Sequence, residues 1–191
     1  MRVLPIEKPR SLRMRLAYAY GKKTYGRVIT PMKVVMARVP AILPVYQKIR
    51  GYMKKSRLDP SLLLLIQGYT AGYNQCGFCI DITRSFAAHD AALLEKLWRV
   101  GDYGVDPIFT DAERAALAYV EAVTRDRAVT DDVFETMKAH YSDEEIVEIT
   151  LVNAIEHFYN LVNGPLGIES DGLCAVKPRG MDASAVSKVT G

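Results

Sequence analysis

Residues 74–83 read NQCGFCIDIT and follow a long apolar segment. Their two cysteines, Cys76 and Cys79, are three residues apart, so on a helix both sulfurs lie on one face, within reach of a disulfide bond or a shared metal ion. Asn74 is a good helix cap, and the N–H groups and dipole at a helix start favour thiolate over thiol. We therefore expect redox chemistry at this pair. The alternative is two incidental buried cysteines.

The composition fits one globular domain. The chain has 191 residues, of which 49% are apolar and 25% are charged, which suffices for a core and excludes disorder of the whole chain. Three cysteines argue against the disulfide framework of a secreted protein and favour a reducing cytoplasm. The longest aliphatic run, Leu62 to Ile66, is too short to span a membrane, and the start lacks the apolar run of a signal peptide. We predict a cytoplasmic protein without a transmembrane segment.

Charge is distributed unevenly along the chain. Residues 1–57 carry fifteen Lys or Arg and one acid, whereas residues 58–191 carry ten bases and twenty-one acids, for a net charge of +3. The basic part can bind a nucleic acid or an anionic membrane, or it can lie on the acidic remainder of its own or a neighbouring subunit. Tyrosines are interleaved with the bases, but no recognisable nucleic-acid motif accompanies them. We therefore prefer the second arrangement and expect no nucleic-acid partner.

Apolar residues recur at helical spacing along most of the chain, and no stretch alternates with period two, so the sequence predicts an all-α fold of about eight helices. Helix starts are marked by Asp59-Pro60 and by capping boxes at Thr110 and Ser142. We expect three segments: a basic N-terminal arm over 1–29, one helical domain over 30–174 and a mobile tail over 175–191. Within the arm, Ser11 is expected to cap a short helix that ends at Gly21. The helices expected in the domain are 31–39, 44–57, 61–73, 74–88, 91–100, 110–124, 130–140 and 142–163.

Four stretches carry a family resemblance. They are the path from Leu62 into YNQCGFCID at 73–81, FTDAERAALAYV at 109–120, YSDEEIVEI at 141–149, and the segment 158–168 that ends in LGI. Together they resemble the alkylhydroperoxidase D-like branch of the carboxymuconolactone decarboxylase family over residues 30–170. The C-x-x-C within this order of helices is fairly specific, and the other stretches are weak alone.

The resemblance implies an alkylhydroperoxidase D-like helical domain that assembles into trimers or hexamers, with no cofactor and no metal. It also implies that Cys79 attacks a hydroperoxide and that Cys76 then closes a disulfide, or that the pair exchanges electrons with another dithiol. The expected partners are therefore a small-molecule hydroperoxide and a protein dithiol reductant.

This sequence departs from the family pattern where a proton acceptor is expected. Leu64 stands where the family commonly has a glutamate, Phe78 where a histidine sometimes precedes the second cysteine, and Thr83 where a histidine commonly follows it. Thr83 is one turn from Cys79 and can donate a hydrogen bond to a thiolate, and His157 can approach the pair from another helix. We take Cys76, Cys79, Thr83 and His157 as the candidate catalytic residues.

Asp81, two residues after the second cysteine, points away from the thiol on a helix, so we assign it packing or a cap contact. A zinc site would need two more ligands, which Cys174 and a histidine could supply only by a long return of the chain. Two other functions stay open: a non-catalytic oligomeric scaffold or binding protein that has lost the proton relay, and a lactone decarboxylase-like enzyme.

Overall fold

The structure, a computed structural model, describes residues 1–174 of the chain. Every regular element within these residues is helical, which confirms the all-α prediction. The predicted tail over 175–191 lies outside the described residues. The α-helices are α1 (Leu12–Tyr25), α2 (Leu43–Met53), α3 (Pro60–Tyr73), α4 (Gly77–Phe86), α5 (Ala91–Arg99), α6 (Asp111–Asp126), α7 (Asp131–Lys138) and α8 (Asp143–Asn163), with short helical turns η1 (Met32–Met36), η2 (Pro40–Ile42) and η3 (Val100–Asp102).

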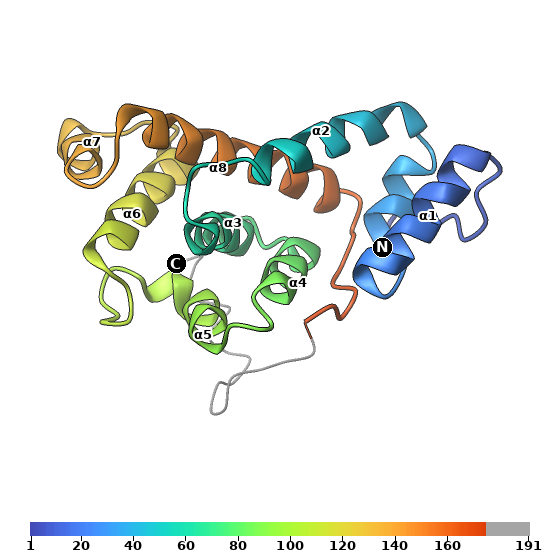
Figure 1. The fold of residues 1–191 in the computed structure, drawn as a ribbon, viewed down its shortest axis with the longest axis horizontal. Helices are drawn as coiled ribbons and strands as arrows, with labels where there is room; N and C mark the ends of the chain where they lie inside the picture. Colours follow the sequence, from blue (N-terminus) through green and yellow to red (C-terminus); the bar gives the residue numbers. More distant parts are fainter. Residues whose placement is uncertain (175–191) are drawn as a thin grey trace.

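Helix α3 is the centre of the fold. Figure 1 shows it nearly end-on, with α4, α5 and α6 around it and α8 and α2 along the opposite side. Asp59 caps its start by accepting from the Ser61 N–H, and Leu65 and Ile66 in its middle are fully buried. A methyl group added at Gly68 would lie 2.7 Å from a Leu97 methyl, so glycine lets α5 approach closely. The prediction of a central buried helix is confirmed.

Two capping boxes fix the helices on the far side of α3. At the start of α6 the side chains of Thr110 and Glu113 each accept a hydrogen bond from the backbone N–H of the other residue. Ser142 and Glu145 make the same pair of hydrogen bonds at the start of α8, as predicted. Thr130 precedes α7 without such a side-chain bond. Within residues 1–174, no helix has the length and apolarity that crossing a lipid bilayer requires.

The N-terminal part differs from the prediction in two places. Ser11 does cap α1, but the helix continues through Gly21, which packs against Met32, and ends before Gly26 at a φ of 75°. The predicted helix over 31–39 is instead a short π-helical turn, in which the Ala37 N–H donates to the Met32 carbonyl five residues earlier.

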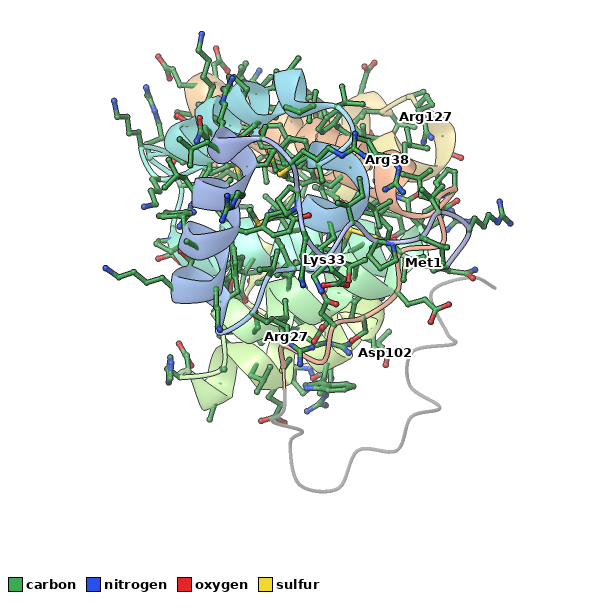
Figure 2. The ribbon with its side chains drawn as sticks, turned by 90° about the vertical axis from the view of Figure 1, so that its right-hand side faces the viewer. Met1, Arg27, Lys33, Arg38, Asp102 and Arg127 are labelled. Atoms are coloured by element: carbon green, nitrogen blue, oxygen red, sulfur yellow. A yellow bond between two sulfur atoms is a disulfide. The ribbon has the colours of Figure 1, made fainter. Side chains whose placement is uncertain are left out.

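Basic side chains of the N-terminal part make ion pairs and hydrogen bonds within the chain. Figure 2 shows Arg27, Lys33 and Arg38 on the face that this part builds. Lys33 pairs with Glu7 at 3.0 Å, Arg38 donates to the Leu4 carbonyl, and Arg27 donates to the Asp171 carbonyl. The first two contacts lie within the N-terminal part, and the third joins it to the C-terminal part of the described chain.

Candidate functional site

The two cysteines lie at the start of α4. Cys76 is the N-cap and Cys79 is in the first turn, with Cα atoms 5.2 Å apart and the sulfurs joined in a disulfide. The chain enters through Gln75 at a φ of 53°, after which the Cys76 N–H donates to the Ala71 carbonyl at 2.9 Å. The first cysteine is thereby fixed against the end of α3. The predicted C-x-x-C at a helix N-terminus is confirmed.

Asn74 does not cap this helix, contrary to expectation. Because the chain turns at Gln75, Asn74 remains on the end of α3 and closes that helix instead. Its side-chain amide donates to the Thr70 carbonyl at 3.0 Å and to Asn160 Oδ1 at 2.9 Å. Asn74 therefore links the residues before the dithiol to α8.

His157 supports Asn74 from α8. Its Nδ1 lies 3.1 Å from the Asn74 amide, and its Nε2 lies 3.2 Å from Thr124 Oγ1. An amide nitrogen can only donate, so Nδ1 is an acceptor that shares the two amide hydrogens of Asn74 with Thr70 and Asn160, and the Nε2–H donates to Thr124. Burial, aided by the positive charge of Arg127, holds the pKa of His157 below its usual value. The ring is thus a neutral anchor, and it is not among the residues that line the cavity described next.

A cavity of about 750 Å³ opens beside Cys79. It lies between α1, α2, α3, α4 and α8, and its walls are mainly apolar. Cys79 is among the lining residues, whereas Cys76 is not. A molecule in the cavity can therefore reach the second cysteine of the motif while the first stays covered.

Asn163, on the last turn of α8, contacts Cys79 directly. Its amide donates to Cys79 Sγ at 3.4 Å, within the sulfur hydrogen-bond range, and its side chain is buried. Its Oδ1 is also buried and has no hydrogen-bond partner among the described residues. Asn163 itself lines the cavity beside Cys79.

Glu156 brings a carboxyl group to the same cavity from α8. Its side chain is 2% exposed, accepts from Asn160 Nδ2 at 2.6 Å and from Gln67 Nε2 at 3.4 Å, and lines the cavity with Cys79. Burial raises the pKa of Glu156 to about 7, although the bonds from Asn160 and Gln67 oppose this shift. A carboxyl group with such a pKa exchanges its proton near neutral pH.

The three positions that depart from the family pattern all line this cavity. Leu64 contributes from α3, and Phe78 and Thr83 contribute from α4, with Thr83 buried one turn after Cys79. The only carboxylic acid among the described lining residues is Glu156. The carboxyl group that lines the cavity therefore belongs to α8, and the position of the family's glutamate on α3 holds the apolar side chain of Leu64.

Asp81 faces away from the cavity and holds the end of the described chain. Its carboxylate accepts from the Leu173 N–H at 2.9 Å and the Cys174 N–H at 2.8 Å. Burial opposes ionisation of Asp81, but the backbone donors of Cys174 and Leu173 outweigh it, so its pKa lies below the usual value. These contacts match the packing role assigned from the sequence.

Sequence reasoning missed Glu156 and Asn163. Both belong to a buried polar stripe on α8, Asn153, Glu156, Asn160 and Asn163, which continues the apolar face of the helix at spacings of three and four residues. That spacing was visible in the sequence and could have identified the stripe, because four polar residues on a core-facing side require partners there. No group of three or more His, Cys, Asp or Glu within residues 1–174 is arranged to hold a metal ion.

Comparison with known proteins gives relatives of similar length and fold. No family model matches the chain. The uncharacterized protein YnjA of Escherichia coli (strain K12) is 30% identical over 158 residues, which cover 81% of this chain and 86% of YnjA.

Two solved structures share the fold. A putative antioxidant defence protein AhpD from Agrobacterium tumefaciens is 28% identical, with a TM-score of 0.67 over 72% of this chain and 96% of that protein. The debrominase Bmp8 is 16% identical, with a TM-score of 0.76 over 98% of this chain and 97% of that protein, a likeness of fold alone. The helical fold thus recurs in proteins that align with most of this chain.

Proposed function

The chain belongs to the alkylhydroperoxidase D-like branch of the carboxymuconolactone decarboxylase family, and on that premise we propose that it is a thiol-dependent oxidoreductase that reduces hydroperoxides. In this proposal Cys79 is the nucleophile, Cys76 is the resolving thiol and Glu156 transfers the proton. The observation that carries the proposal is the shared cavity, which is lined both by a cysteine of the dithiol and by a buried acid with a pKa of about 7.

The first step consumes the hydroperoxide. With both cysteines reduced, the Glu156 carboxylate takes the proton of the Cys79 thiol, and the thiolate attacks the terminal oxygen of the hydroperoxide. The O–O bond breaks, Cys79 becomes a sulfenic acid, and the departing alkoxide takes the proton from Glu156 and leaves as an alcohol. The amide of Asn163 stabilises the thiolate before attack, because it already donates to this sulfur.

The second step closes the disulfide. The Cys76 sulfur attacks the Cys79 sulfenic acid, an S–S bond forms, and the hydroxyl leaves as water with the proton of Cys76. Two electrons from the thiol pair have then reduced the O–O bond. An external dithiol, which we take to be that of a protein reductant, then exchanges with the Cys76–Cys79 disulfide: both thiols are restored and the reductant leaves as a disulfide.

The remaining candidate residues have supporting roles in this proposal. Thr83 lies one helical turn from Cys79 and can donate its hydroxyl to the thiolate. His157 is a positioning residue, because it acts on the motif through Asn74. We also propose a cytoplasmic protein that assembles as a trimer or hexamer.

Thiol counting tests the proposal. The reduced protein, freed of dithiothreitol, receives one equivalent of cumene hydroperoxide, and we expect two thiols to disappear, with Cys76 and Cys79 joined in the peptide map. Cys76→Ser should stop at a sulfenic acid on Cys79 that dimedone traps, and Cys174→Ser should behave as the parent protein. Retention of both thiols in the parent would contradict the proposal and favour a non-catalytic scaffold.

A further inference from the structure

We propose that the cavity beside Cys79 binds a long-chain carboxylic acid that carries a hydroperoxide in mid-chain, with its carboxylate at Arg50 and Lys54 of α2 and its hydroperoxide at Cys79. This inference deepens the proposed function and rests on it. It follows from the shape of the cavity, the exposure of its two ends and the charges along its wall.

The cavity is elongated along its helical walls. Its lining residues recur on one face of α4, from Cys79 to Phe86, and on one face of α3, from Pro60 to Gln67. Each of these two walls covers eight residues, and the seven steps between its first and last residue rise about 10 Å along an α-helix. Ala71 bonds the start of α4 and Gly68 faces Thr83 further along it, so the two helices run in opposite directions and form one channel.

The two ends of the channel differ in exposure. Cys79, Glu156 and Asn163 at one end are all less than 5% exposed. At the other end the lining side chains of Tyr20 and Phe86 are 55% and 56% exposed. The thiol is therefore at the closed end, and a ligand enters past Tyr20 and Phe86.

Cationic side chains line the channel at its open end. Arg50 on α2 and Lys54 at the C-cap of this helix are one turn apart, and the Arg50 guanidinium lies 5.4 Å from the centre of the Tyr20 ring, which lines the same end. Neither has an ion-pair partner within the described part of the chain. An anionic group at the open end would therefore interact with two cationic side chains without breaking an existing ion pair.

The region between the two ends is apolar. Met53, Leu63, Leu64 and Ile82 line it, and burying an alkyl chain there gains free energy in proportion to its area. A carboxylate that entered first would meet the buried acid Glu156, so the apolar part enters first and the anion stays outside. The ligand that fits has an anionic head, an apolar chain and a reactive group about 10 Å from the head. The chain beyond the reactive group would pack on the further apolar wall of the cavity, which Ile29, Met32 and Met36 form in the same cluster as Cys79.

Catalysis tests the proposal with the full chain. We compare the rate of thiol oxidation by linoleic acid hydroperoxide, its methyl ester and cumene hydroperoxide. The acid should react at least tenfold faster than the ester. The double variant Arg50→Gln, Lys54→Gln should remove that preference without slowing cumene hydroperoxide, whereas the matched control Lys48→Gln, Lys55→Gln, outside the lining, should keep it. Equal rates for acid and ester in the parent protein would overturn the inference.

Binding separates this inference from the proposed function. Dodecanoate should bind the disulfide form of the parent protein, and the Arg50→Gln, Lys54→Gln variant should bind it at least tenfold more weakly. If dodecanoate binds but no hydroperoxide oxidises the thiols, the proposed function fails and the anionic site stands. If cumene hydroperoxide is reduced but dodecanoate does not bind, the inference fails alone. If dodecanoate does not bind and the protein self-associates so that the channel is covered, the channel is an interface for a second copy of the chain and the inference fails.

Discussion

The side-chain amide of Asn163 donates a hydrogen bond to the sulfur of Cys79 at 3.4 Å and so connects the end of α8 to the first turn of α4. The contact is buried, and the other atom of the same amide, Oδ1, has no partner among the described residues. One residue thus both lines the cavity and donates a hydrogen bond to the sulfur.

Asn163→Leu should slow alkylation of Cys79. The substitution keeps the branched shape and the number of heavy atoms of the side chain and removes the donor to the sulfur. A hydrogen bond to a charged group contributes about 1.5–3 kcal/mol, so the thiolate population should fall by about tenfold or more. The measurement is the iodoacetamide rate of the reduced protein in a Cys174→Ser background, followed at Cys79 by mass spectrometry. An unchanged rate would show that Asn163 only packs against the sulfur.

Glu156→Gln should slow hydroperoxide reduction by about a hundredfold at pH 7.5, the usual size of a general-base effect. The pKa of Glu156 is raised to about 7, so the parent rate should increase with pH through a midpoint near 7 as the carboxylate forms. The Gln variant should lack that midpoint. The measurement is the rate of thiol loss from pH 5.5 to 8.5. A parent profile without a step near pH 7, or a variant that keeps the step, would remove Glu156 from the mechanism.

The helical order could be predicted from the sequence because its signals are local. The cap at Asp59 and the capping boxes at Thr110 and Ser142 act within one turn, and all three mark helix starts in the structure. The end of α1 could not be placed correctly because Gly21 suggested a stop, whereas a distant residue, Met32, packs against it and the helix continues.

The site itself could be predicted only in part, for a related reason. The spacing of Cys76 and Cys79 is local and predicted their proximity, but the groups that act on Cys79 come from a helix about eighty residues later in the chain. Glu156 and Asn163 reach the cavity only because α8 packs across α3 and α4. The sequence does show that Leu64 replaces the family's acid. Only the structure shows that the carboxyl group of Glu156 lines the same cavity as Leu64.

The stability of the protein should depend on the ionisation of Glu156. Its pKa is about 7 in the folded state and about 4.5 in the unfolded state, so between these values the unfolded chain loses a proton that the folded chain retains. The contribution of Glu156 to stability is therefore full below pH 4.5 and falls by about 3 kcal/mol as the pH rises through 7. Urea unfolding at pH 5 and pH 8 should show a smaller pH-dependent loss for Glu156→Gln than for the parent. Identical losses would contradict the raised pKa.

Gly68→Ala should destabilise the fold, and Gly51→Ala should not. A methyl group at Gly68 would lie 2.7 Å from a Leu97 methyl in the packed contact between α3 and α5, so one helix or the Leu97 side chain must shift, at a cost of about 1–3 kcal/mol. Gly51, on α2, has nothing within 4 Å of the added methyl, and alanine there should gain about 0.5–1 kcal/mol in helix propensity. Thermal unfolding of the two variants should shift in opposite directions from the parent. If both variants unfold at a higher temperature than the parent, Leu97 accommodates the methyl group freely and the close approach of α5 does not require glycine.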